Sequence, residues 1–334
     1  MGDAAQQEEV EFAVVGVDHP HVYLLTAELE RAGARCVGFF DTTDQDGSTF
    51  TALFPTVPTL DLDDLGENAP PLIIVGSVPN ERAQFALEAL DAGADVLAAK
   101  PGATSQDQLA KIEAATGTTG RRWWVAFTED FCSRAATRAH TLAQSGRIGT
   151  VRHVLGLGPH RTGDHRPGWF TNPLLSGSML ADLASHQIHH AMRLLGTDEL
   201  EVVTARTTPA PNGTHPELVG EVLLEGGTGS AYCRVDWLTP AGLPTWGDVR
   251  LMITGDEGTI EVRANCDIAG RDGADHIIIC DRNGIEHINC ADDTLTWPTQ
   301  LLADVRDRTE TATSTAHSLA VSRLALHAAD IARR

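Results

Sequence analysis

The first 128 residues alternate short apolar segments with segments of helical periodicity. The segments that match buried strands are 11–16, 35–41, 71–77, 95–100 and 122–128. The segments between them that match helices are 20–33, 80–93 and 105–117. Strands that alternate with helices of this length favour an α/β fold with a parallel, doubly wound sheet of the Rossmann type. We therefore expect residues 1–128 to form a dinucleotide-binding domain.

The pattern changes after residue 128, where strands follow one another with few helices between them. The expected strands are 151–157, 201–207, 218–225, 229–237, 249–254, 258–263, 276–281 and 285–290. The expected helices are 131–146, 178–195 and 315–333. Residues 129–334 are therefore predicted to form an α+β domain for substrate binding and oligomerisation, with a large, mostly antiparallel sheet. Its last helix could pack back on the first domain.

Charge and composition limit the partners of this chain. It has 46 acidic and 25 basic residues and a formal net charge of −21, which disfavours nucleic acid and anionic membranes. No apolar run approaches the ~20 residues of a membrane span, and the polar N-terminus lacks the features of a secretory signal. The six cysteines form no Cys-x-x-Cys pair, as expected of reduced thiols. We expect a cytoplasmic protein.

The loop after the first expected strand departs from the dinucleotide-binding pattern Gly-x-Gly-x-x-Gly. Gly16 holds the first position, but Asp18 and His21 stand where the second and third glycines belong. Asp18 is predicted to cap the following helix and so to compete with a pyrophosphate for the same amides. We therefore expect a displaced dinucleotide with His19 beside its phosphates or nicotinamide, and tighter binding in Asp18→Gly.

Two further positions at strand ends carry candidate site residues. Asp41 ends the second strand, where an acid can accept the adenosine ribose hydroxyls and disfavour a 2′-phosphate, or can cap a loop. Lys100 ends the fourth strand and could donate to a substrate hydroxyl, or could be a surface lysine before a turn proline. Only one other lysine, Lys111, occurs in the chain, so a lysine retained at this edge favours a chemical role.

The segment Gly177–Gly196 concentrates acid and imidazole groups at helical spacing. Asp182, His186 and either His189 or His190 fall on one face of the expected helix. A carboxylate one turn from an imidazole can orient it as a general base. The same residues could instead bind a metal, although no His-Glu-x-x-His pattern is present, or could be buried histidines with satisfied hydrogen bonds. We predict the acid–base pair and no metal.

Two loops carry residues suited to a polyol. The segment Gly158–Phe170 contains His160, Arg161 and Trp169, which combine hydrogen-bond donors with an aromatic face. Trp246 lies in a similar but weaker segment, Val235–Asp248. The alternative is a solvated loop that buries one tryptophan.

Taken together, these motifs resemble the Gfo/Idh/MocA family, the glucose–fructose oxidoreductases and inositol dehydrogenases. The resemblance covers nearly all of residues 11–330. It rests on Ser-Val-Pro-Asn (77–80), the Lys100-Pro101 step, Gly-Arg-Ile-Gly (146–149) and the glycine-led Asp-x-x-x-His helix. The chain looks closest to a subgroup with Asp-His-x-His in the first loop. It departs from the family pattern at Asp18, Ala99 and His189, where the family usually has Gly, Glu and Asp.

This resemblance implies hydride transfer between a nicotinamide and a carbinol or ketone of a sugar, glycoside or cyclitol. NAD is the expected cofactor, with NADP disfavoured by Asp41. The implied catalytic set is Lys100, Asp182 and His186. The implied cofactor contacts are Gly16, Asp18, His19, Asp41, Ser77, Pro79, Asn80 and Lys100. The implied substrate contacts are His160, Arg161, Trp169, His189 and Trp246.

The same analogy implies a homodimer or homotetramer formed through the sheet of the second domain. Two other functions fit the same fold. One is a keto-sugar lyase or hydrolase that uses tightly bound NAD or a metal, and the other is a sensor that binds a sugar or dinucleotide without turnover.

Overall fold

The computed structural model describes residues 9–43, 47–61, 66, 69–163, 166–211, 213 and 215–334. The chain divides into two compact units, each built from segments distant in sequence. Unit 1 comprises Met1–Gly102, Ala110–Val125 and Thr296–Ser318, and unit 2 comprises Ala103–Leu109, Ala126–Leu295 and Leu319–Arg334. The division into domains at residue 128 stays a prediction. No helix among the described residues is both long and apolar enough to cross a membrane.

Unit 1 contains a five-stranded sheet with the order β2-β1-β3-β4-β5. Its strands are β1 (Glu11–Val15), β2 (Arg35–Phe40), β3 (Leu72–Val75), β4 (Asp95–Ala99) and β5 (Trp123–Ala126). Strand β1 pairs in parallel with both β2 and β3, and β3 pairs in parallel with β4. All residues of β3 and β4 are buried, as expected of a parallel sheet covered on both faces. The predicted doubly wound fold is confirmed.

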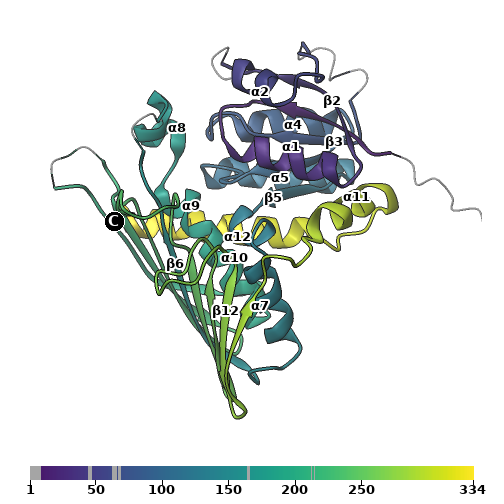
Figure 1. The fold of residues 1–334 in the computed structure, drawn as a ribbon. Coiled ribbons are helices and arrows are strands. Elements are labelled where there is room, and N and C mark those ends of the chain that lie inside the picture. Colours follow the sequence, from purple (N-terminus) through teal and green to yellow (C-terminus); the bar gives the residue numbers. More distant parts are fainter. Residues whose placement is uncertain are drawn as a thin grey trace, which may run out of the picture. The chain divides into compact units, whose positions relative to one another are not determined.

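The helices of unit 1 lie on both sides of this sheet (Figure 1). They are α1 (His21–Arg31), α2 (Gly47–Leu53), α4 (Arg82–Asp91), α5 (Gln106–Thr119) and α11 (Trp297–Asp307). Sequence reasoning placed α1, α4 and α5 but missed α2 and α11. Helix α11 packs beside α1 and buries Trp297, Leu301 and Val305. These positions recur at helical spacing, so the pattern for α11 was present in the sequence.

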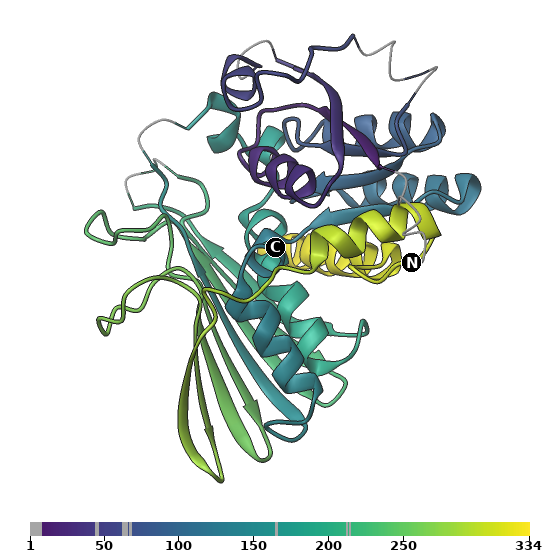
Figure 2. The same ribbon diagram turned by 45° about the vertical axis from the view of Figure 1, so that its right-hand side comes forward.

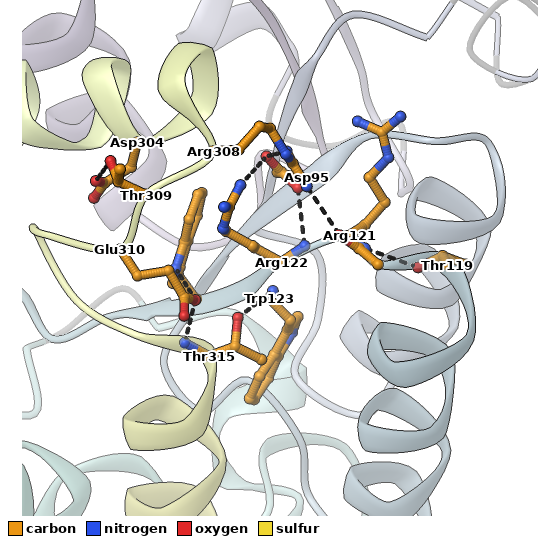
Figure 3. Close-up of polar contacts among 12 residues, drawn as sticks. Asp95, Thr119, Arg121, Arg122, Trp123, Asp304, Arg308, Thr309, Glu310 and Thr315 are labelled. Carbon is orange, nitrogen blue, oxygen red and sulfur yellow. Dashed lines mark hydrogen bonds and ion pairs between the residues drawn. The ribbon is translucent and has the colours of Figure 1, made fainter.

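A polar network fixes the beginning of β4 in unit 1 (Figure 3). The fully buried Asp95 accepts the N–H of Arg122 at 2.9 Å and forms an ion pair with Arg308. The N–H of Trp123 donates to the hydroxyl of Thr315 at 3.2 Å. These contacts join β4 and β5 to the segment that follows α11. They lie at the amino end of β4, at the opposite end of that strand from Lys100.

Unit 2 contains an eight-stranded sheet with the order β13-β12-β11-β10-β6-β9-β8-β7. Its strands are β6 (Val151–Pro159), β7 (Glu201–Thr208), β8 (Val219–Gly226), β9 (Gly229–Asp236), β10 (Arg250–Gly255), β11 (Gly258–Arg263), β12 (His276–Asp281) and β13 (Gly284–Asn289). All neighbours pair antiparallel except β6 and β9, which are parallel. The predicted large, mostly antiparallel sheet is therefore confirmed.

Unit 2 contains the helices α6 (Thr128–Phe131), α7 (Arg134–Gln144), the 3-10 turn η1 (Gly168–Thr171), α8 (Pro173–Ser176), α9 (Met179–Asp182), α10 (Ala184–Leu195) and most of α12 (Thr315–Ala332). Helices α7 and α10 cover one face of its sheet (Figure 2). Helix α10 packs on β6, β8 and β9, α7 packs on β11 and β12, and the two helices contact each other. Outward-facing Val203 and Met252 are about half exposed. Self-association through this sheet stays a prediction.

Candidate active site

The loop after β1 makes a tight turn that requires glycine. Gly16 has φ +77°, and a Cβ atom there would lie 2.3 Å from the Cα and the backbone nitrogen of Ser77. Its N–H donates to the carbonyl of Phe40 at 2.8 Å. The loop is thereby held against the residues that follow β3 and the end of β2. Any larger residue would push the first and third strands apart, so Gly16 is a fixed part of this edge.

Asp18 does not cap α1, so the N-cap prediction is wrong. Its buried carboxylate instead accepts the hydroxyls of Thr42 and Thr43, at 2.8 and 2.6 Å. Pro20 occupies the N-cap position without a side-chain cap. Two hydroxyl donors in the loop after β2 draw the carboxylate across the sheet edge, away from the helix. We expected Asp18 to compete with a pyrophosphate, and Asp18→Gly to bind the dinucleotide more tightly. Both expectations assumed that Asp18 caps α1, so they lose their basis.

His19 takes over part of the capping that was expected of Asp18. Its Nδ1 accepts the N–H of His21 at 3.3 Å, and its carbonyl accepts the N–H of Val22 at 3.1 Å. The N–H of His19 donates to the carbonyl of Gly76 at 3.1 Å. The histidine therefore joins the first turn of α1 to the end of β3. No local sequence signal predicts an imidazole in this role, because histidine is not a preferred capping residue.

Asp41 closes the turn that leads from β2 to α2. One carboxylate oxygen accepts the N–H of Thr43 at 3.2 Å, and the other accepts the N–H of Gly47 at 2.7 Å. Each oxygen of a carboxylate can accept more than one hydrogen bond, so Asp41 can also accept ribose hydroxyls. From the sequence alone, capping of the loop and binding of the ribose were alternatives for Asp41. In this geometry the carboxylate can do both.

The ends of β3 and β4 bring the remaining candidates of unit 1 to the same sheet edge. Ser77 is fully buried, and within the described part of the chain its hydroxyl has no hydrogen-bond partner. Pro79 and Asn80 follow it before α4. Lys100 is 3% exposed, whereas Lys111 is on the exposed face of α5. Because β1, β3 and β4 are adjacent and parallel, Gly16, Ser77 and Lys100 gather at one edge.

In unit 2, the predicted helix over 178–195 is interrupted at Leu183. Asp182 ends α9, and His186 lies in the first turn of α10. The hydroxyl of Ser185 donates to the carbonyl of Asp182 at 2.9 Å, and the N–H of His186 donates to the carbonyl of Leu183 at 3.2 Å. A serine that bonds a neighbouring carbonyl competes with the helical ladder. His186 is buried, while Asp182 is half-buried.

Asp182 lies in the lining of a pocket within unit 2. Other residues of this lining are Phe170, Ser178, His215, Glu217 and Trp237. The Glu217 carboxylate accepts the hydroxyl of Ser178 at 2.9 Å and the N–H of Met179, so it anchors the turn that carries Asp182. Sequence reasoning missed Glu217, because it lies 35 residues beyond Asp182 with no motif around it.

The other predicted substrate residues belong to two linked loops of unit 2. His160 lies with Nε2 3.6 Å from a Glu129 carboxylate oxygen, and its ring centroid is 4.6 Å from that of Trp246. The guanidinium of Arg161 donates to the carbonyls of Pro240 and Leu243 at 2.9 and 2.6 Å. Trp169 contacts Phe170 edge to face. Residues 164–165 of the predicted loop lie outside the described residues.

His189 belongs to a buried network around Asp130. Its Nε2 lies 2.8 Å from the Asp130 carboxylate, which also forms an ion pair with Arg193. Nε2 of His140 lies 3.6 Å from Asp130 and 3.0 Å from Nδ1 of His190. Burial alone would raise the pKa of Asp130, but His140, Arg193 and His189 hold that pKa well below its usual range. The carboxylate is therefore ionised inside the protein.

The donor atoms of Asp130, His140 and His190 lie within 4.8 Å of one another, as the ligands of a metal ion would. However, Arg193 and His189 already contact the same carboxylate. A divalent cation would add positive charge to a buried site whose one anion is already paired, and such burial is costly. The contacts fit a hydrogen-bonded network better than a metal centre.

The network makes the stability of the protein depend on pH. Burial lowers the pKa of His190 from 6.5 to about 4. As the pH falls from about 6.5 to about 4, the unfolded chain binds a proton that the folded protein excludes, so the free energy of unfolding should fall by ~3 kcal/mol. Urea denaturation at pH 7 and pH 4 measures this change. His190→Gln should have a smaller pH slope, and an equal slope would contradict the assignment.

The chain is similar in sequence and in fold to known proteins. Residues 136–261 match the model of the GFO/IDH/MocA C-terminal domain. No curated protein sequence matches the chain. The structure of a putative oxidoreductase from Erwinia carotovora atroseptica SCRI1043 is 34% identical, with a TM-score of 0.93 over 97% of this chain and 99% of that one.

Two more distant structures share the fold. One is levoglucosan dehydrogenase in complex with NADH and levoglucosan, at 14% identity and a TM-score of 0.81 over 98% of both chains. The other is an oxidoreductase from Agrobacterium radiobacter in complex with NAD⁺, L-tartaric acid and magnesium, at 16% identity and a TM-score of 0.80 over 98% of this chain and 97% of that one. With the matched domain and the end-to-end likeness at 34% identity, this chain belongs to the Gfo/Idh/MocA family.

Proposed function

We propose that this protein is an NAD-dependent oxidoreductase that transfers a hydride between the nicotinamide and a carbinol or ketone of a sugar, glycoside or cyclitol. The observation that carries the proposal is the close contact of Gly16 with Ser77. A Cβ at Gly16 would lie 2.3 Å from Ser77, so only a glycine lets the loop after β1 lie against the end of β3, at the carboxyl edge where ligands bind in folds of this kind. Membership of an oxidoreductase family supports the same activity.

The residues at this edge fit a dinucleotide. Ser77 lies directly after β3 at this edge, and its buried hydroxyl has no hydrogen-bond partner among the described residues. Pro79 and Asn80 extend the same edge. Asp41 would accept the ribose hydroxyls, and the nearby carboxylate of Asp18 adds a second negative charge that disfavours a 2′-phosphate. We therefore favour NAD over NADP. His19 borders the loop and completes the proposed cofactor contacts.

The proposed catalytic set is Lys100, Asp182 and His186. NAD, when bound, supplies the hydride acceptor. Lys100 would hydrogen-bond the substrate oxygen and stabilise its developing negative charge. His186 would remove the hydroxyl proton at an imidazole nitrogen, and Asp182 would orient that ring. In the reverse direction, the protonated imidazole returns the proton to the oxygen of the alcohol.

The side chains that line the pocket in unit 2 would suit contacts with a polyol. It combines the carboxylates of Asp182 and Glu217, which can accept hydroxyl donors, with the aromatic faces of Phe170 and Trp237. Arg166 stacks over the ring of Phe170 at 4.5 Å and contributes to the cluster. His160, Arg161, Trp169, His189 and Trp246 stay proposed substrate contacts. The levoglucosan complex of a structural neighbour agrees with a sugar-like substrate.

The direct test mixes purified protein with NAD⁺ and a panel of sugars, glycosides and cyclitols, and follows absorbance of the reduced nicotinamide. Isothermal titration calorimetry measures the affinity of the same protein for NAD⁺ and for NADP⁺. We expect NAD⁺ to bind more tightly than NADP⁺ and at least one polyol to be oxidised. No binding of either dinucleotide would refute the proposal. Binding without turnover of any polyol would favour the sensor function instead.

A further inference from the structure

A fully buried arginine lies directly beneath the edge that carries Lys100. Arg82, at the start of α4, has no solvent exposure. Its Nε donates to the carbonyl of Ser77 at 2.8 Å. Its Nη1 donates to three successive carbonyls, those of Ala99, Lys100 and Pro101, at 3.2, 2.6 and 3.0 Å. One side chain thus joins the segment after β3 to the segment after β4.

These contacts suit the chemistry of a guanidinium group. Its nitrogens form a planar fork that donates in several fixed directions and keeps its charge when buried. Removing such a charge from water is costly unless its donors are satisfied, so the carbonyls and the cation stabilise each other. A lysine carries its three donors on a single nitrogen and cannot donate from two separated atoms of one rigid plane.

We propose that Arg82 is a positioning residue that fixes the backbone of Lys100 relative to Ser77. The shortest of its hydrogen bonds, at 2.6 Å, is to the carbonyl of Lys100 itself. The Nε contact, at 2.8 Å, is to the carbonyl of Ser77, a proposed cofactor contact. Arg82 therefore sets the separation between the proposed donor to the substrate and the proposed cofactor edge. This role rests on the proposed function, but its structural part can be measured without turnover.

The chain offers an internal reference for that measurement, because Lys100 and Lys111 are its only lysines. Lys100 is 3% exposed and Lys111 is exposed. Limited reductive methylation followed by peptide mapping gives the labelling rate of Lys100 relative to Lys111. In Arg82→Gln we expect this ratio to rise by about 5-fold or more, because the loop that shields the ammonium loses its fixed carbonyl contacts.

The control is Asp95→Asn, which weakens the network at the opposite end of the same strand (Figure 3). It should lower the melting temperature, as Arg82→Gln does, while leaving the labelling ratio unchanged. Arg82→Lys serves as a second variant if Arg82→Gln does not fold, and it should give a smaller rise in the ratio. An unchanged ratio in every folded Arg82 variant, or an equal rise in Asp95→Asn, would overturn the positioning role.

Steady-state kinetics test whether Arg82 matters for the proposed reaction. A misplacement of about 1 Å can cost ~10²-fold in rate. We therefore expect Arg82→Gln to lower kcat by about that factor, with KM for NAD⁺ changed by less than about 3-fold. Asp95→Asn should keep kcat. Equal losses of kcat in the two variants would leave Arg82 only a structural role. If the wild type binds no NAD⁺, the proposed function fails, and the labelling ratio still decides whether Arg82 holds Lys100.

Discussion

Replacing Lys100 by methionine should lower kcat by about 10³-fold while leaving the fold intact, because the variant loses the proposed donor to the substrate oxygen. Methionine is close to the lysine stem in length and is apolar, so it suits a position that is 3% exposed. Removing a buried ammonium also removes its desolvation cost. Steady-state kinetics with the best substrate from the polyol panel, together with a thermal melt, measure both effects.

Lys111→Met is the matched control. Lys111 is exposed on α5 and has no proposed role in the reaction. It should keep kcat within about 2-fold of the wild type, as surface substitutions usually leave the protein unaffected. A Lys100→Met enzyme that retains more than about a tenth of wild-type kcat would remove Lys100 from the catalytic set. A lost affinity for NAD⁺ with kcat unchanged would assign it to cofactor binding alone.

Replacing Asp130 by asparagine should lower the free energy of unfolding by about 3 kcal/mol or more, which is typical of removing one partner from a buried charge network. The Asp130 side chain is 2% exposed and contacts His189 and Arg193, with His140 at 3.6 Å. Asparagine keeps the shape but removes the negative charge. Arg193 is one-third exposed and can partly reach water, which places the expected loss at the lower end of the range.

Urea denaturation at pH 7 measures this loss. The control is Asp256→Asn, which breaks an ion pair with Arg152 in which both side chains are about half exposed. Exposed pairs of this kind contribute little to stability, because water screens the two charges. If the two substitutions destabilise the protein equally, Asp130 does not organise the interior of unit 2. If Asp130→Asn is more stable than the wild type, the free-energy cost of burying the carboxylate exceeds the stabilisation that its ion pairs and hydrogen bonds provide.

The fold was largely predictable because its signals are local. Uninterrupted apolar runs such as 72–75 and 96–99 are typical of strands in a sheet covered on both faces, and the helices between them indicate its parallel direction. In β10 burial alternates, as expected of a sheet covered on one face, although its sequence Leu251-Met252-Ile253 is apolar throughout and does not show the alternation. Element boundaries were less predictable, since no local signal in the sequence marked the break at Leu183 between α9 and α10.

The site was only partly predictable, because its contacts are long-range. Asp18 has every local feature of a helix cap, yet its partners come from Thr42 and Thr43 in another loop. Asp130 stands in an ordinary helical turn, and the imidazole of His189 reaches it only from 59 residues away along the chain. The positioning role of Arg82 could not be predicted from the sequence, because its partners are backbone carbonyls, which every residue carries. Capping propensity describes neighbours along the chain and cannot anticipate such contacts.

The two hydrogen bonds from the threonines to Asp18 also bear on how cofactor preference could evolve. A lineage that replaced Asp41 to admit a ribose phosphate would still present the carboxylate of Asp18 at the same edge. Loss of Asp18 alone would leave both threonine hydroxyls to find new acceptors. We therefore expect substitutions at positions 18, 41, 42 and 43 to be epistatic, and the proposed nucleotide preference to change mainly through linked changes in both loops.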